Sequence, residues 1–566
     1  MAVNWTSKQQ EVIDSRNRNL LVSAAAGSGK TAVLVERIIQ MISEGDRPLD
    51  IDQLLIMTFT NAAAAEMRER IGAAVEQKLK ERPEDEHLWL QAALIPQAQI
   101  TTIDSFCLNI IRSHYNSLDI DPAFRMGDEG ELSLLRGDCM GEMLENCYDE
   151  ADAEFARFVE HFGRGKSDRG IEDVILQAWQ FSQSHPWPGE WLASCQKELE
   201  EESILEMEES PWMVFLMEDV ARQMEELSGQ LGEALQVCLE ENGPLAYEPM
   251  LISDRSKIEA IGRAAATGSF EALYNSLQNM SFGRLASIRS KDIDGDKKAF
   301  VSACRDRVKK AVAKCRELYG QQSPEEVVES MRGTRTVIRE LLRLTGMFDQ
   351  AYRDAKRERN VLDFNDLEHL TLEVLYEREE TGDGEETVFR RPSQVADELS
   401  RQYEEILVDE YQDTNLAQFK LISLLASKYR NLCVVGDDDQ SIYRFRGADI
   451  GNILSFEETF PGAKVIKLEQ NYRSTQNILN AANGVIRHNR GRKDKTLWTA
   501  NGEGELIRFK QFVTAREEAD FVAREIRDSV YAYQDQAVLY RTNAQSRLLE
   551  ERCIFYNVPY RLVGGV

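Results

Sequence analysis

The chain has 566 residues, of which 42% are hydrophobic and 29% charged, which predicts a soluble protein of several domains. It has no apolar run that could span a membrane, no secretory signal and no Cys-x-x-Cys pair, so we expect a cytoplasmic protein with reduced thiols and no zinc site. The net charge of −29 disfavours nucleic acid as a partner but does not exclude it, because a binding groove is local.

The first motif lies between a predicted strand and a predicted helix. Residues 19–23 (NLLVS) form a short apolar run, and residues 32–42 (AVLVERIIQMI) have the apolar spacing of a helix. The small residues between them would let backbone N–H groups close around a phosphate at the helix N-terminus. We therefore predict a P-loop, in which the lysine reaches the β- and γ-phosphates of a nucleotide and the last hydroxyl binds Mg²⁺. Its residues are Ala24, Ala25, Ala26, Gly27, Ser28, Gly29, Lys30 and Thr31.

The loop departs from the strict motif at one position, since Ala24 stands where the motif has Gly. A turn of small residues that only caps the helix is the alternative. Two further short strands, at 54–57 and 99–102, are each followed by a helical pattern, as in a parallel α/β fold. Phe59 follows the first of these between two threonines, where it could stack on a base or belong to the core.

Residues 120–345 have a different pattern, with many helical segments, few strand signals and frequent acidic runs. We predict a large helical insertion there, without a catalytic set of residues. The segment HPWPGEW (185–191) is a Pro/Trp turn that we expect to serve packing rather than function.

An apolar run at 406–408 is followed by two carboxylates, Asp409 and Glu410. Ligands of open α/β sheets bind at the carboxyl ends of strands. The two side chains point to opposite sides of a strand, so one could hold Mg²⁺ while the other orients a water. A solvated acidic turn is the alternative, because acidic residues are usually exposed.

More strands are predicted in the last third of the chain. A strand at 432–435 leads into GDDDQSIYRFRGA, and a strand at 464–468 leads into EQNYRST. Two further strands, at 505–512 and 536–540, are predicted on either side of a helix at 514–530.

Taken together, these motifs resemble those of superfamily 1A DNA helicases, the UvrD/PcrA/Rep/AddA group. The resemblance covers nearly the whole chain and is weakest across the acidic insertion. Residues 1 to about 410 resemble AddA, whereas residues from about 411 resemble PcrA. The motifs that carry it are TSKQQEVI, AAAGSGKT, TFTNAAAAEMRERI, TIDSF, VDEYQDT, GDDDQSIYRFRGAD and LEQNYRST.

The resemblance implies ATP and Mg²⁺ as cofactors and assigns roles to individual residues. Gln9 would contact adenine, and Arg37 and Tyr472 would flank the nucleotide. Asp409 would bind Mg²⁺ together with Thr31.

Catalytic and DNA-binding roles also follow from the resemblance. Lys30 would serve the phosphates, Glu410 would orient and deprotonate the attacking water, and Gln440 would sense the γ-phosphate. Arg473 would supply charge to the transition state. The residues expected to contact DNA are Phe59, Asn61, Tyr443 and Phe445.

The implied fold is a P-loop NTPase with a RecA-like motor domain. This first domain would comprise residues 1–119 and 346–455. A helical insertion would span 120–345, and residues 456–566 would form an incomplete second RecA-like domain.

The implied function is that of an ATP-dependent 3′-to-5′ DNA helicase, which moves on single-stranded DNA in recombination and double-strand break repair. The implied partners are single- and double-stranded DNA and an AddB-like subunit. Motifs V and VI and a nuclease domain are not in this sequence, so we expect weak or absent ATP hydrolysis and no unwinding from this chain alone. The alternatives are a PcrA/UvrD-type repair helicase, a non-catalytic fragment that binds ATP or single-stranded DNA, and a P-loop ATPase unrelated to DNA.

Overall fold

The computed structural model describes residues 5–150, 152–163, 167–199, 204–288, 292–379, 389–489, 492–493 and 495–563. The chain forms two compact units. The first comprises Met1–Ser23 and Thr31–Lys467, and the second comprises Ala24–Lys30 and Leu468–Val566.

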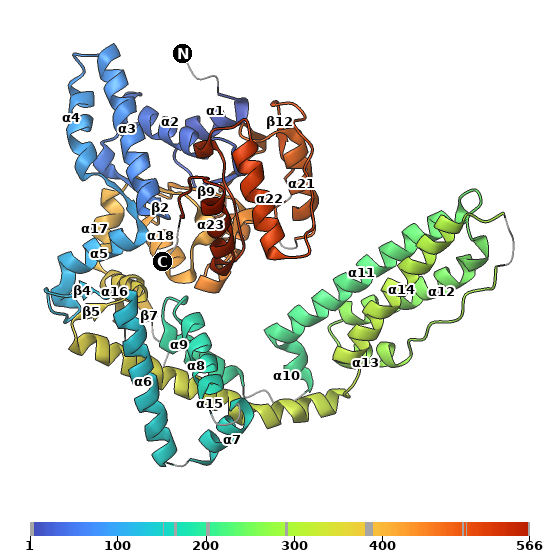
Figure 1. Ribbon diagram of the computed structural model, residues 1–566. Coiled ribbons are helices and arrows are strands. Elements are labelled where there is room, and N and C mark those ends of the chain that lie inside the picture. Colours follow the sequence, from blue (N-terminus) through green and yellow to red (C-terminus); the bar gives the residue numbers. More distant parts are fainter. Residues whose placement is uncertain are drawn as a thin grey trace. The chain divides into compact units, whose positions relative to one another are not determined.

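A six-stranded sheet in the order β10-β1-β9-β8-β2-β3 forms the centre of the first unit (Figure 1). β1 pairs with β9, β9 with β8, β8 with β2 and β2 with β3, in each case in parallel. The predicted parallel α/β fold is therefore confirmed, and the carboxyl ends of these strands meet at one edge of the sheet. The strands are β1 (Leu20–Ala24), β2 (Leu54–Thr58), β3 (Gln99–Thr102), β8 (Glu405–Val408), β9 (Leu432–Gly436) and β10 (Lys464–Leu468).

The sheet continues past residue 456, where we predicted the second domain to begin. β10 lies beside β1, and the backbone N–H of Lys464 donates to the carbonyl of Asn19 at 2.9 Å. The first unit accordingly extends to Lys467. The physical reason is that an apolar strand beside the edge of a sheet gains partners for its backbone groups.

The helices next to the sheet begin where the sequence provides caps. Thr60, Thr102 and Asn415 each accept a hydrogen bond from a backbone N–H in the first turn of α3, α5 and α18. One large core joins α5, α16 and α18 to apolar side chains of the sheet. The helices around the sheet are α1 (Ser7–Asp14), α2 (Lys30–Ser43), α3 (Asn61–Glu81), α4 (Glu86–Leu94), α5 (Ile103–His114), α16 (Phe364–Leu375), α17 (Gln394–Gln402), α18 (Leu416–Leu425), α19 (Gly451–Leu454) and α20 (Phe456–Thr459).

Within the first unit, a helical insertion begins after β4 (Arg125–Met126) and ends at β5 (Val361–Leu362), two short strands that pair in parallel. It has two separate cores. One joins α6, α7 and α8 to the long helix α15, and the other lies among α11, α12, α13 and α14 (Figure 1). The helices are α6 (Glu129–Glu150), α7 (Ala153–Phe162), α8 (Arg169–Ser182), α9 (Pro188–Glu198), α10 (Ile204–Glu209), α11 (Pro211–Leu239), α12 (Glu248–Ala266), α13 (Phe270–Gln278), α14 (Gly295–Tyr319) and α15 (Pro324–Glu358).

Buried ion pairs fix the return of the insertion to the sheet. The Nζ atom of Lys356, near the end of α15, lies 2.9 Å from Asp363 and 2.6 Å from Asp366 at the start of α16. An antiparallel hairpin follows, formed by β6 (Tyr376–Glu379) and β7 (Phe389–Pro392). Across the ranges that the structure describes, no helix is both long and apolar enough to cross a membrane.

The second unit has little regular sheet. It contains the short parallel strands β11 (Gln470–Asn471) and β12 (Trp498–Thr499) and the helices α21 (Gln476–Ile486), α22 (Ala515–Asp528) and α23 (Ser546–Phe555). The predicted strands at 505–512 and 536–540 are wrong, since neither segment forms a strand. Phe509 is 91% exposed and Leu539 94% exposed. Without a neighbouring strand to pair with, an apolar pattern alone does not make a ladder.

Candidate functional site

A tight loop joins β1 to α2 and contains the predicted P-loop. Gly27 and Gly29 have φ angles of +73° and +83°, in the left-handed region that strains any residue with a side chain. The hydroxyl and the backbone N–H of Ser28 both donate to the carbonyl of Ala25, at 2.7 and 3.2 Å. Because the loop then enters α2 at Lys30, it has the form of an anion-binding turn at a helix N-terminus.

One buried side chain of the second unit, Asn471, holds this loop. Its Nδ2 donates to the carbonyl of Ala26 at 2.6 Å. Its Oδ1 accepts from the backbone N–H groups of Arg473 and Ser474, at 2.9 and 2.7 Å. A single amide therefore joins the P-loop to the turn that carries Arg473.

The backbone adds a second link between the same segments. The N–H of Tyr472 donates to the carbonyl of Gly27 at 2.8 Å. A Cβ atom at Gly27 would lie 2.8 Å from both the Cβ of Arg473 and the Nδ2 of Asn471, so only glycine fits. The side chains of Tyr472 and Arg473 are exposed, and the roles predicted for them stay predictions.

In the first unit, the predicted carboxylates follow β8 directly. The backbone N–H of Asp409 still donates to the carbonyl of Met57 in β2, at 2.9 Å. Glu410 then turns into the left-handed region, with φ 54° and ψ 42°, and its N–H donates to Asp409 Oδ1 at 3.0 Å. A non-glycine residue in this region is uncommon, and such strain is concentrated at functional sites.

A chain of hydrogen bonds runs from Glu410 to the next strand end. The buried Gln412 donates through Nε2 to Glu410 Oε2 at 2.9 Å and accepts through Oε1 from the backbone N–H of Asp437 at 2.9 Å. The Nε2 of Gln440 in turn donates to the carboxylate of Asp437. A Cβ atom at Gly436 would lie 2.8 Å from Gln412 Oε1, so this glycine makes room for the amide.

The predicted DNA-contacting aromatic residues form a row in the first unit. The rings of Phe59 and Tyr443 are 5.0 Å apart, and those of Tyr443 and Phe445 are 6.0 Å apart. Phe59 is 40% exposed and Phe445 76% exposed, so Phe59 is not a core residue. Asn61 is exposed in the first turn of α3, two residues after Phe59. Two exposed rings on either side of the partly buried Tyr443 are a suitable surface for stacking unpaired bases.

Two residues assigned to the nucleotide are engaged within the protein. Gln9 closes the capping box of α1, where its Oε1 accepts from the backbone N–H of Thr6 at 3.1 Å. Arg37 is fully buried, and its guanidinium contacts Glu405 at 2.8 Å and the carbonyl of Val12 at 2.6 Å. We therefore correct the prediction that Arg37 flanks the nucleotide. A buried arginine needs a buried carboxylate, and Glu405 supplies it.

Comparison with known protein families agrees with this geometry. The UvrD/REP helicase N-terminal domain family matches residues 5–461, and the UvrD-like helicase C-terminal domain family matches residues 466–566. The chain belongs to the UvrD/REP helicase family. All of the motifs on which the sequence resemblance was based lie within the residues that these two families match.

Individual relatives of this UvrD-like helicase chain are named as subunits of an ATP-dependent helicase/nuclease. The protein of Lachnoclostridium phytofermentans is 41% identical over 85% of this chain and 35% of its own length. The proteins of Clostridium perfringens and Geobacillus thermodenitrificans are 40% and 39% identical, over 86% and 85% of this chain and 38% and 39% of their own length. The chain thus spans well under half the length of these relatives.

These alignments bear on the two-part resemblance. They cover more of the UvrD-like helicase chain than residues 1 to 410 alone would supply. The similarity to the helicase/nuclease relatives therefore continues past the first carboxylates of the VDEYQDT motif.

The residues predicted to bind Mg²⁺ suit that ion chemically. Mg²⁺ is commonly bound by one or two protein oxygens together with phosphate oxygens. Thr31, in the first turn of α2, and Asp409, at the end of β8, supply a hydroxyl and a carboxylate. Among the described residues of this UvrD-like helicase chain, no group of three or more His, Cys, Asp or Glu could hold a metal without a nucleotide.

Sequence reasoning missed three side chains of this site. Asn471, Gln412 and Asp437 all lie inside the quoted motifs EQNYRST, VDEYQDT and GDDDQ. The available signal was their position next to a predicted catalytic residue. The hydrogen bonds from Asn471 to Ala26 and from Asp437 to Gln412 join residues that are far apart in the chain, so spacing alone could not predict them.

Proposed function

We propose that this chain is the ATP-driven motor part of a superfamily 1A DNA helicase that moves on single-stranded DNA. The observation that carries the proposal is the hydrogen-bonded path in the first unit. It runs from Glu410 through Gln412 and Asp437 to Gln440, three residues before Tyr443 in the aromatic row. A change at the catalytic carboxylate thus has a short route to the DNA-contacting rings.

The chemistry proposed at the nucleotide is phosphoryl transfer to water, in which the protein mainly positions groups and stabilises charge. Lys30 would neutralise the β- and γ-phosphates, and Arg473 would add charge as the transition state forms. Glu410 would orient the attacking water and accept its proton. Gln440 would respond to the γ-phosphate. Mg²⁺, held by Thr31 and Asp409, would neutralise phosphate charge when bound.

The DNA side of the proposal rests on stacking. Phe59, Tyr443 and Phe445 would each offer a face to a base, which is tolerant of sequence because every base has a π-face. This suits a motor that must move along any strand. We adopt the 3′-to-5′ direction from the family resemblance.

The biological role follows from the relatives. Their names describe one subunit of an ATP-dependent helicase/nuclease, which implies a further subunit and a nuclease activity for those proteins. We propose that this chain acts in DNA recombination and double-strand break repair with an AddB-like partner.

Two binding measurements on the 566-residue chain test the proposal. Fluorescent ATP should bind, and Lys30→Ala should weaken it strongly while leaving oligo(dT) affinity unchanged. Tyr443→Ala should weaken oligo(dT) binding by about 5- to 100-fold, as expected for loss of one stacked base, and leave ATP binding unchanged. If Tyr443→Ala left oligo(dT) affinity unchanged, the assigned DNA surface would be wrong.

A further inference from the structure

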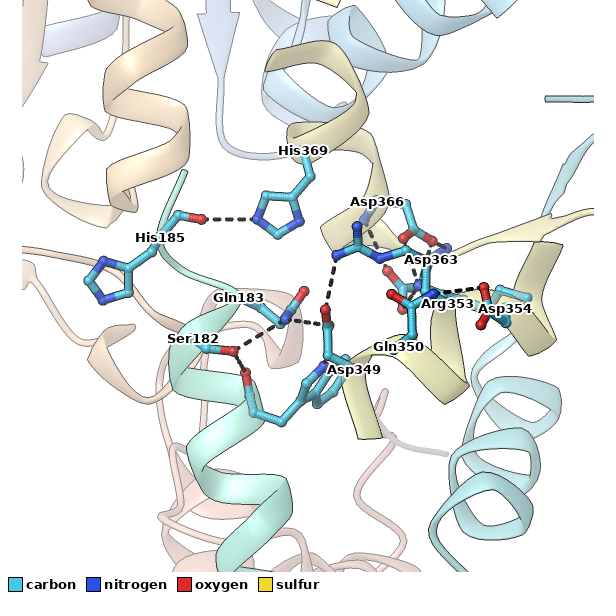
Figure 2. Close-up of polar contacts among 12 residues, drawn as sticks. Ser182, Gln183, His185, Asp349, Gln350, Arg353, Asp354, Asp363, Asp366 and His369 are labelled. Atoms are coloured by element: carbon cyan, nitrogen blue, oxygen red, sulfur yellow. Dashed lines mark hydrogen bonds and ion pairs between the residues drawn. The ribbon is translucent and has the colours of Figure 1, made fainter. Parts of the chain in front are cut away.

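The turn between α8 and α9 belongs to the helical insertion but contacts the rest of the first unit, which contains the six-stranded sheet and is called the motor below. The backbone N–H of Ala417, in the first turn of α18, donates to the carbonyl of Ser184 at 3.3 Å. The Nε2 of His369, in α16, contacts the carbonyl of His185 at 3.0 Å (Figure 2). The guanidinium of Arg390, in β7, lies 4.0 Å from the centre of the Trp187 ring. Three motor elements thus hold this short turn.

The insertion holds the other side of the same turn. Asp349 of α15 accepts from Gln183 Nε2 at 3.0 Å (Figure 2). It also accepts from Trp179 Nε1 at 3.0 Å. The Oγ atom of Ser184 donates to the carbonyl of Phe181 at 2.7 Å. A turn with its side chains and carbonyls engaged in this way cannot shift without breaking several hydrogen bonds, each contributing about 1 kcal/mol.

The loop from Tyr443 to Ala448, called the aromatic loop below, contacts this turn at Gly447. The backbone N–H of Gly447 donates to the carbonyl of Arg444 at 3.0 Å, and the backbone N–H of Ala448 donates to the carbonyl of Tyr443 at 3.3 Å. These two hydrogen bonds close the turn that carries Phe445. Gly447 has a φ of +87°. A Cβ atom there would lie 2.6 Å from the Cβ of Ser184, so the loop backbone rests directly on the insertion.

We propose that Ser184 is a positioning residue for DNA binding, which fixes the aromatic loop through its contact with Gly447. The contact between the α8–α9 turn and the motor then determines the positions of the Tyr443 and Phe445 rings. This inference rests on the proposed DNA contact of those two side chains. Ser184 directly precedes the segment HPWPGEW (185–191), which we expected to serve packing, so the proposal gives the turn that these residues share a role in single-stranded DNA affinity.

The turn between α8 and α9 also contacts the segment that follows the predicted carboxylates Asp409 and Glu410. Ala417 lies three residues after Thr414, and the carbonyl of Thr414 accepts from the backbone N–H of Asp449 at 2.9 Å. The Nδ2 of Asn452 donates to that same carbonyl at 3.0 Å. The aromatic loop is therefore held between the acidic motif on one side and the insertion on the other.

A double-mutant cycle separates the contact from backbone strain. Gly447→Ala should weaken oligo(dT) binding by about tenfold, because alanine is strained in the left-handed region and its methyl group overlaps Ser184. Ser184→Gly removes the overlapping atom but not the strain. The double variant should therefore recover at least about threefold of the lost affinity. Gly141→Ala in α6 is the matched control, because a Cβ atom added there would have no neighbouring heavy atom within 4 Å. This variant should bind oligo(dT) as tightly as the unmodified chain.

Fluorescent ATP affinity, measured on every variant, distinguishes positioning from misfolding. It should stay constant while oligo(dT) affinity changes. If Gly447→Ala lost ATP binding as well, Ser184→Leu would replace it, with weaker oligo(dT) binding and unchanged ATP binding expected. Equal effects of Gly447→Ala with and without Ser184→Gly would overturn the inference. If Tyr443→Ala were also silent, the proposed function itself would fail.

Discussion

At the scale of single residues, each unit has a buried, uncharged side-chain amide that holds predicted site residues. Gln412 and Asn471 are both buried, and each satisfies groups from two separate segments. A buried amide can donate and accept at once, which a carboxylate cannot do. Replacing either amide by its acid therefore leaves a buried acceptor facing another acceptor, at a cost of about 1–3 kcal/mol.

Asn471→Asp is predicted to weaken nucleotide binding by about tenfold. The variant keeps the acceptor for Arg473 and Ser474 but places a carboxylate oxygen against the carbonyl of Ala26. Titration with fluorescent ATP measures the effect. Asn480→Asp, on the exposed side of α21, is the control and should leave the affinity unchanged. Equal affinities for the two variants would show that Asn471 does not hold the P-loop.

Glu410→Gln should separate nucleotide binding from hydrolysis. The amide oxygen can still accept from Gln412, so ATP affinity should stay within about twofold. Loss of the base should lower DNA-stimulated turnover by about 100-fold or more, in whichever form of the protein shows turnover. Turnover equal to that of the unmodified protein would refute the role assigned to Glu410.

At the scale of secondary-structure elements, α16 and α18 are joined by a buried carboxyl group. Glu368 accepts from Asn415 Nδ2 at 2.7 Å and from Gln418 Nε2 at 2.6 Å, at the N-terminus of α18. Burial raises the pKa of Glu368 to about 7, although the hydrogen bond from Asn415 acts in the opposite direction. This helix begins directly after the VDEYQDT motif, so its anchor also supports the site.

Glu368→Gln is predicted to change how stability depends on pH. The folded pKa of about 7 lies above the ordinary value of 4.5, so the folded state holds the proton more tightly. The resulting stabilisation is present below about pH 4.5 and is lost as pH rises toward 7, by at most about 3 kcal/mol. Urea midpoints of both proteins near pH 5 and pH 8 measure this. The unmodified chain should lose more stability than the variant, and parallel pH profiles would contradict the assignment.

The strands and helices of the first unit were predictable because their signals are local. An apolar run before AAAGSGKT and the caps Thr102 and Asn415 are visible in the sequence itself. The segment 505–512 was not predictable in this way, since a strand requires a neighbour that the pattern does not identify. The prediction that Arg37 flanks the nucleotide was wrong for a related reason. Its partner Glu405 lies far away in the sequence, and only the fold reveals that the pair is buried.

At the scale of the whole molecule, the proposed nucleotide site and the proposed DNA surface belong to a chain whose net charge is −29. Stacking and local contacts, rather than overall charge, must then provide most of the DNA affinity. By thermodynamic reciprocity, if ATP alters DNA affinity, DNA alters ATP affinity by the same factor. The hydrogen bonds of Gln412 to Glu410 and Asp437 are the physical connection that we propose between the nucleotide site and the DNA surface.

The most direct test of this connection is the oligo(dT) affinity of the chain with and without saturating ATP and Mg²⁺. We predict that the nucleotide changes this affinity by about fivefold or more, which is the usual size of coupling between two sites. Gln412→Ala should abolish the change while both ligands still bind. An oligo(dT) affinity that is the same with and without nucleotide would contradict the account.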